Sequence, residues 1–179
     1  MIKKKAYYLW GLFPPKETEY LNFIKDKVQS KLISPYFDLH ITLLGPYLNI
    51  DKTFIYKLRS FGENNSSIML HVDGYCFKQE MFKSFYLSIK NSLPLKKLRQ
   101  NIYKLNKFDL DNNYSPHISL CYGNHRIQEK KELIFNLPKF NKIIKMSKIG
   151  LVEINQDINQ WKIEESFDLN PYLSQPIQF

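Results

Sequence analysis

Two short stretches, "DLHITLLG" (residues 38–45) and "SPHISLCYG" (residues 115–123), decide the fold of this chain. Both have the alternation of a half-buried β-strand, in which successive side chains point to opposite faces. His40 and Thr42 therefore share one face of the first strand, while the apolar residues beside them point the other way. The second stretch repeats the same order of residue types, so the sequence predicts two strands that each present a histidine and a hydroxyl.

The surroundings of these strands repeat as well. The interval from His40 to His117 is nearly the same as the interval from Tyr7, where "YYLWGL" begins, to Phe85, where "FYLSIK" begins. Each aromatic stretch precedes an amphipathic helix and then the strand that carries the histidine. The order predicts two related lobes that face each other across a pseudo-twofold axis, with both histidines and both hydroxyls on one groove.

Hydrophobic periodicity and turn residues predict the remaining elements. The expected helices cover residues 17–33, 51–60, 94–105 and 126–134. The expected strands cover residues 6–12, 37–45, 67–75, 82–90, 115–121, 142–154 and 160–167. Because no stretch resembles a linker or a low-complexity segment, we expect residues 1–179 to form a single bilobal domain.

The composition of the chain limits the kinds of partner and environment that we expect for it. A net charge of +9 favours an anionic partner, with a nucleotide or RNA first. The 44% of hydrophobic residues are enough for a packed core, and no apolar run reaches the roughly 18–20 residues that cross a bilayer. Two cysteines, Cys76 and Cys121, cannot build a disulfide framework. We therefore expect a cytoplasmic monomer with no membrane contact.

Paired histidines suit one reaction well. Because a histidine has an ordinary pKa near 6.5, one neutral ring can accept a proton while a protonated one donates. Hydrolysis of a cyclic phosphate needs both, a base for water and an acid for the departing ribose oxygen. Thr42 and Ser119 supply hydroxyl donors for the non-bridging phosphate oxygens. No metal is required, and the spacing of the histidines and cysteines does not resemble a zinc site.

The motifs "HITL" and "HISL" resemble the paired H-φ-[ST]-φ motifs of the 2H phosphoesterase superfamily. Within it the chain is most similar to the cyclic phosphodiesterases of plants and yeast, through "YYLWGLFP" with Trp10, "FYLSI", and "YSPHISLCYG" with Tyr122. The resemblance implies a bilobal α+β fold in which two antiparallel sheets flank a water-filled central groove, with the helices outside.

The resemblance also implies that the chain opens ADP-ribose 1″,2″-cyclic phosphate or a nucleoside 2′,3′-cyclic phosphate without metal or cofactor. His40 and His117 carry over as catalytic acid and base, in an order that the sequence leaves open. Thr42 and Ser119 carry over as phosphate ligands. Two alternatives remain: a 2′,5′-phosphodiesterase or RNA-end processing enzyme, and a non-catalytic protein that binds RNA or a nucleotide.

Two aromatic residues, Trp10 and Tyr122, are expected either to contact the base or ribose of a substrate or to pack in the core. Tyr122 lies five residues after His117, so a regular strand would turn it away from the groove and turn Cys121 toward it. A bend near Gly123 would bring Tyr122 back into the groove.

Overall fold

The fold is described from a computed structural model, which covers residues 5–106, 113–140 and 142–173. Its strands are β1 (Ala6–Leu12), β2 (Ile41–Tyr47), β3 (Ile68–Phe77), β4 (Phe85–Ile89), β5 (His117–Cys121), β6 (Ile143–Met146), β7 (Lys148–Ile154) and β8 (Lys162–Asp168). Its helices are α1 (Pro15–Gln29), α2 (Lys52–Glu63), α3 (Leu93–Asn106) and α4 (Ile127–Asn136), with short 3-10 turns η1 (Met81–Lys83) and η2 (Ile158–Gln160).

The strands form one antiparallel sheet in the order β6-β3-β4-β5-β2-β1-β7-β8. Its two halves, β6-β3-β4-β5 and β2-β1-β7-β8, meet where Ile41 of β2 pairs with Ile118 of β5. The predicted α+β class is confirmed, and the two expected sheets are these two halves of a continuous, strongly curled sheet.

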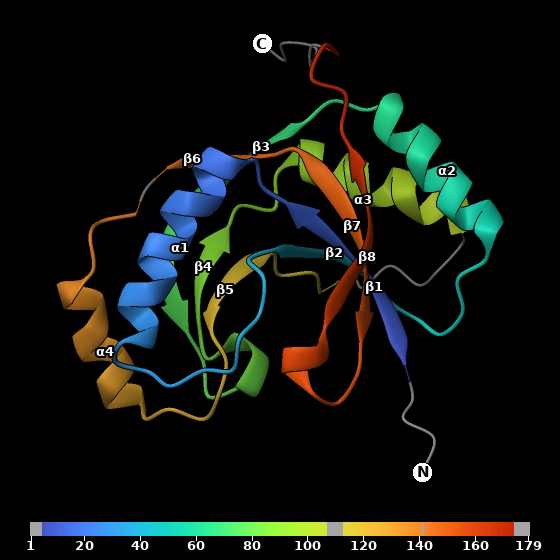
Figure 1. The fold of residues 1–179 in the computed structure, drawn as a ribbon. Helices are drawn as coiled ribbons and strands as arrows, with labels where there is room; N and C mark the ends of the chain where they lie inside the picture. Colours follow the sequence, from blue (N-terminus) through green and yellow to red (C-terminus); the bar gives the residue numbers. More distant parts are fainter. Residues whose placement is uncertain (1–4, 107–112, 141, 174–179) are drawn as a thin grey trace.

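The helices lie on the outside of the sheet, with α1 and α4 together on one side and α2 and α3 together on the other (Figure 1). Helix α1 contacts β5 and α4 contacts β3, whereas α2 packs on β8 and α3, and α3 also contacts β2 and β3. The helix that follows β1 therefore packs on the other half of the sheet, and the helix that follows β4 reaches across to β2. This exchange ties the halves together by more than the pairing of β2 with β5.

Helices α1 and α3 each bury one apolar face, in line with the amphipathic helices that the sequence predicts. Helix α1 buries Leu21, Ile24 and Val28, spaced as one face of a helix. It ends at Gln29, earlier than predicted, and Leu32 packs into the core from the following turn. In α3 the buried stripe is Leu95, Leu98 and Ile102. No helix in the described ranges is long and apolar enough to cross a membrane.

The strand predicted over 142–154 is wrong as a single element. It divides at Ser147 into β6, which pairs with β3, and β7, which pairs with β1 in the other half. The backbone of Ser147 bonds to residues next to β1 and β8. Its N–H donates to the Leu12 carbonyl, and its carbonyl accepts from the Leu169 N–H. An apolar run indicates that a segment is buried but not which strand it pairs with. The sequence therefore could not reveal that this segment pairs with two different strands.

The predicted register of the repeat, which matches Tyr7 to Phe85, is also corrected. In β1 Trp10 pairs with Thr42, and in β4 Tyr86 pairs with Ser119. Trp10 and Tyr86 are therefore equivalent, each opposite the hydroxyl residue of its own motif. Aligning "YYLWGL" with "FYLSIK" by residue type therefore gives a different register from the one in the structure.

The seam between the halves should dominate stability. Ile118 is fully buried and pairs with Ile41 on one side and Leu87 on the other. Ile118→Ala is expected to lower the free energy of unfolding by about 2–5 kcal/mol, because the sheet on both sides holds the cavity open. Urea unfolding would measure the change.

A matched control for that variant is Ile33→Ala, whose side chain is 88% exposed. It should change the free energy of unfolding by less than about 0.5 kcal/mol. Similar losses in the two variants would contradict the role given to the seam.

Candidate active site

A cavity of about 620 Å³ lies where the two halves of the sheet meet. Its lining includes all six residues that the sequence singled out, namely Trp10, His40, Thr42, His117, Ser119 and Tyr122. Residues from both halves contribute, as expected for a groove between related lobes.

The two motifs are neighbours in the sheet. Their central isoleucines pair directly, and continuing this antiparallel register by one residue puts His40 beside Ser119 and Thr42 beside His117. Side chains one residue from a pair lie on the opposite face from the pair itself. The isoleucines therefore enter the core, and each histidine lies beside the hydroxyl of the other motif on the cavity face.

Both histidines are held by the same backbone contact. His40 Nδ1 lies 2.7 Å from the Asp38 carbonyl oxygen, and His117 Nδ1 lies 2.9 Å from the Ser115 carbonyl oxygen. Because a carbonyl can only accept a hydrogen bond, Nδ1 carries the hydrogen in each ring. When a ring is neutral, its Nε2 is left as the basic nitrogen, on the opposite edge.

The environment of His40 keeps it uncharged. Its side chain is 6% exposed, and its ring stacks on the Trp10 indole with centroids 3.5 Å apart and planes 3° from parallel. Burial lowers the pKa of His40 from near 6.5 to about 3, although the Asp38 carbonyl opposes this. His117 and Lys25 lower the pKa further as nearby cations.

The environment of His117 is more open and more mixed. Its ring meets the Tyr86 ring edge-on, with centroids 5.2 Å apart and planes at 66°. Burial lowers the pKa of His117, and Lys83 adds to the effect. The Ser115 carbonyl and the Glu80 carboxylate act in the opposite direction and favour the protonated ring. The two halves of the site thus hold matching rings in unequal surroundings.

Tyr122 reaches the cavity because β5 contains a bulge. Tyr86 pairs with Ser119, but the residue before it, Phe85, pairs with Cys121, so β5 has one extra residue here. Both residues after Ser119 turn into the core, and Tyr122 returns to the cavity side. Cys121 would face the groove only if β5 were a regular strand. Because of the bulge, it is buried in the core instead.

Sequence reasoning missed several aromatic residues of the cavity, among them Phe82 in η1 and Trp161 after η2. These two come from hairpins of opposite halves, and their rings lie 5.9 Å apart with planes at 26°. Each also meets the Tyr122 ring edge-on. Phe82 was missed because the sequence analysis placed it inside a strand over 82–90, whereas it lies in the turn before β4. An exposed aromatic residue followed by a lysine could have indicated a contact with a substrate.

Two buried cations brace the segment that carries the first motif. Lys25 of α1 donates to the Phe37 carbonyl and lies 4.1 Å from the centre of the Phe37 ring. Arg99 of α3 donates from Nε to the Leu43 carbonyl at 2.8 Å. These bonds lie on either side of His40, so helices from both halves hold the backbone that orients its ring.

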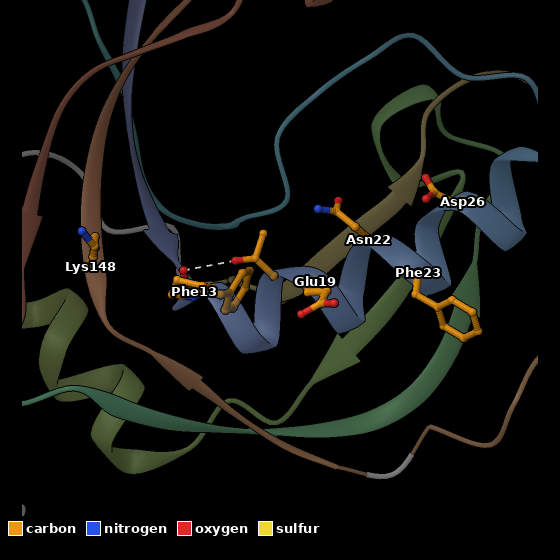
Figure 2. A pocket seen from close by; sticks show the side chains of 8 residues that line it. Phe13, Glu19, Asn22, Phe23, Asp26 and Lys148 are labelled. Carbon is orange, nitrogen blue, oxygen red and sulfur yellow. Dashed lines mark hydrogen bonds between the residues drawn. The ribbon is translucent and has the colours of Figure 1, made fainter.

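A second hollow, of about 780 Å³, lies along α1 away from the histidines. Figure 2 shows its side chains spaced along the helix, among them Glu19, Asn22 and Asp26, with Lys148 of β7 at one end. It has no paired titratable groups of the kind found at the cavity. Within the described ranges, no three His, Cys, Asp or Glu residues are grouped closely enough to hold a metal ion.

No family model matches the chain, and no curated protein is significantly similar to it. Among solved structures, E. coli LigT in its apo form superposes with a TM-score of 0.61 at 12% identity, over 93% of this chain and 98% of LigT. LigT in complex with 3′-AMP gives 0.60 at 12% identity, over 92% and 98%. The protein TT0787 of Thermus thermophilus gives 0.59 at 13% identity, over 92% and 97%.

These similarities establish the fold. The chain is built on the fold of the 2H phosphoesterases over more than nine-tenths of its length. The resemblance inferred from the two short motifs is thereby confirmed at the level of the fold.

Burial of a neutral His40 should make the protein less stable in acid. Its folded pKa of about 3 lies below the unfolded value near 6.5, so between these values the unfolded chain binds a proton that the folded chain does not. The free energy of unfolding should therefore fall as pH drops from 6.5 toward 3, by up to about 1.4 kcal/mol per pH unit from this group. Urea unfolding at about pH 7, 6, 5 and 4 would measure the slope.

The His40→Asn variant should lose this part of the slope. His71→Asn, a change at an exposed position of β3, should keep it. Equal slopes for wild type and His40→Asn would show that His40 does not remain neutral in the folded protein.

Proposed function

We propose that the chain is a phosphodiesterase that hydrolyses a cyclic phosphate by general acid–base catalysis with His40 and His117. The observation that carries this proposal is the matched hydrogen bonding of the two rings. Each Nδ1–H donates to a backbone carbonyl, which leaves each Nε2 available for proton transfer. Both rings line one cavity from opposite halves of the sheet.

The proposed reaction uses four side chains. One Nε2 takes a proton from a water molecule, whose oxygen attacks the phosphorus. The bond from phosphorus to a ribose oxygen breaks, and the other Nε2–H gives that oxygen a proton, so the product is a phosphomonoester. The hydroxyls of Thr42 and Ser119 donate to the non-bridging oxygens, where charge increases in the transition state. In this proposal no metal and no cofactor takes part.

Several observations favour a nucleotide-sized substrate, either a nucleoside 2′,3′-cyclic phosphate or ADP-ribose 1″,2″-cyclic phosphate. The cavity of about 620 Å³ lies within the usual range for small-molecule sites, about 300–1,000 Å³. Tyr122, Phe82 and Trp161 offer aromatic surface to a base or ribose, and Lys83 offers a cation. LigT, which shares the fold, has been solved with 3′-AMP, ATP and NADP+.

The alternative substrate is a linear one, an RNA end or a 2′,5′-linked oligoadenylate. The net charge of +9 favours it, because a basic surface attracts a phosphate backbone. The same four side chains would serve, so products must separate the two cases. A protein that only binds RNA or nucleotides would not need two rings with matched free nitrogens.

The direct test is turnover in EDTA. Purified protein would be incubated with ADP-ribose 1″,2″-cyclic phosphate, each nucleoside 2′,3′-cyclic phosphate and a 2′,5′-oligoadenylate, and products would be read by phosphorus NMR. We expect a cyclic phosphate to open. His40→Ala and His117→Ala should each lower kcat by about 10²- to 10⁴-fold, because each removes one proton-transfer group.

His71→Ala, at an exposed position away from the cavity, is the matched histidine control and should keep wild-type turnover. Cleavage of the oligoadenylate alone would keep the site and change the substrate. No turnover of any substrate by folded protein would refute catalysis and favour a binding protein.

A further inference from the structure

The buried faces of α1 and α3 match each other residue by residue. Each face consists of three apolar residues and one cation at the same spacing: Leu21, Ile24, Lys25 and Val28 in α1, and Leu95, Leu98, Arg99 and Ile102 in α3. The two cations therefore occupy the same place on their helices. Each helix is followed by a strand that carries one of the two motifs. Lys25 and Arg99 are thus equivalent residues of the two repeats.

Each of these cations lies against an aromatic ring that precedes a histidine by three residues. Lys25 Nζ is 4.1 Å from the centre of the Phe37 ring, and Arg99 Cζ is 3.3 Å from the centre of the Tyr114 ring. The residue after each aromatic residue supplies the carbonyl to which the Nδ1–H of the histidine donates. Cation, aromatic ring, carbonyl and histidine therefore follow one another in the same order in both halves.

We propose that Lys25 and Arg99 are positioning residues, each of which holds the aromatic residue before one histidine and so fixes the carbonyl that orients this histidine and selects its tautomer. The effect on turnover rests on the proposed function. A ring that loses this carbonyl can turn, or can carry its hydrogen on Nε2. A neutral ring with hydrogen on Nε2 has no free nitrogen on the side of the cavity and cannot accept a proton there.

Lys25 holds the segment before His40. Its ammonium donates to the Phe37 carbonyl, in the peptide unit just before the Asp38 carbonyl that accepts from His40. On its other side the Phe37 ring stacks on the Tyr122 ring of the cavity, with centroids 4.0 Å apart. The segment is therefore clamped between α1 and the end of β5, and the Asp38 carbonyl has little freedom to move.

Arg99 holds the segment before His117 and also reaches across the seam to the first motif. Its guanidinium lies over the Tyr114 ring, and the Tyr114 hydroxyl donates to the Thr42 carbonyl at 2.8 Å. Arg99 Nε donates to the next carbonyl of the same strand, that of Leu43, at 2.8 Å. Because β2 and β5 pair only at their central isoleucines, these two bonds help to fix the place of Thr42 relative to His117.

The burial of Lys25 favours a role other than stability. The residue is 5% exposed, and among the described residues it forms no ion pair with a carboxylate. Taking an ammonium out of water without such a partner costs free energy, whereas a methionine of similar length fills the same space without that cost. What the lysine adds to the packing is its hold on Phe37.

The experiment determines the tautomer of each ring in the folded protein without substrate. Proton–nitrogen correlation NMR of protein labelled at its histidine nitrogens, at about pH 8 where the rings are neutral, shows which nitrogen carries the hydrogen. Wild type should show hydrogen on Nδ1 in both rings. Lys25→Met should give a mixture of tautomers at His40 and leave His117 unchanged. Arg99→Met should give a mixture at His117, with a smaller change at His40 because Leu43 also loses its donor.

Two controls separate positioning from folding. Lys97→Met removes an exposed lysine of α3 and should change neither ring. Ile102→Ala opens a cavity in the buried face of the same helix, so it should lower stability while both rings keep their tautomer. If Lys25→Met or Arg99→Met fails to fold, Phe37→Leu or Tyr114→Leu removes the ring of the same pair and should change the same histidine.

Turnover of the cyclic phosphate gives a second readout. Lys25→Met and Arg99→Met should each lower kcat by about 10- to 100-fold and change KM by less than about threefold, because a misdirected ring slows the chemical step while the binding cavity remains. Lys25→Met should do so without loss of stability in urea unfolding. Arg99→Lys, which keeps the charge over the Tyr114 ring but not the planar guanidinium, should recover part of the loss.

Three results would overturn the inference: a single tautomer at His40 in folded Lys25→Met, equal changes at both rings in that variant, or the same effect from Ile102→Ala as from Arg99→Met. Each would leave the proposed function standing, because turnover would still depend on both histidines. No turnover by wild type would overturn the proposed function, and the NMR comparison would still decide whether Lys25 and Arg99 orient the two rings.

Discussion

The pairing of β2 with β5 at Ile41 and Ile118 is the contact on which the rest of the structure depends. It joins the two halves of the sheet and puts the apolar members of both motifs into one core. Because side chains alternate along a strand, the same pairing turns the histidines and hydroxyls to the other face. Stability and site geometry therefore both depend on this one strand pairing. The cavity lies at the same junction, on the face of the sheet opposite the isoleucines.

The chemistry of the site depends on a second, smaller constraint. A strand residue whose ring nitrogen reaches the carbonyl two residues earlier has little freedom to turn, and both His40 and His117 make this contact. This contact selects one tautomer without a carboxylate partner. Burial and neighbouring charges then determine how the pKa values of the two rings differ. Here burial acts more strongly on His40, which lies against an indole.

Much of this could be predicted from the sequence, because the signals were local. The helices, most strands, the shared face of His40 and Thr42 and that of His117 and Ser119 follow from periods of 3.6 and 2. The errors were those of pairing: the division at Ser147 and the register of β1 against β4 depend on partners distant in the chain. The bulge that brings Tyr122 into the cavity depends on β4 in the same way.

By itself, then, the sequence determined the α+β class, the repeat of strand, helix and strand, and the residue types that a two-histidine site needs. Only the tertiary structure decided that each histidine lies beside the hydroxyl of the other motif, and that Phe82 and Trp161 from opposite hairpins meet over the cavity. It also decided that Trp10 supports His40 face to face while Tyr86 meets His117 edge-on. The reason is physical: alternation and amphipathicity are properties of a single segment, whereas register, burial and ring orientation are set by packing between segments far apart in the chain.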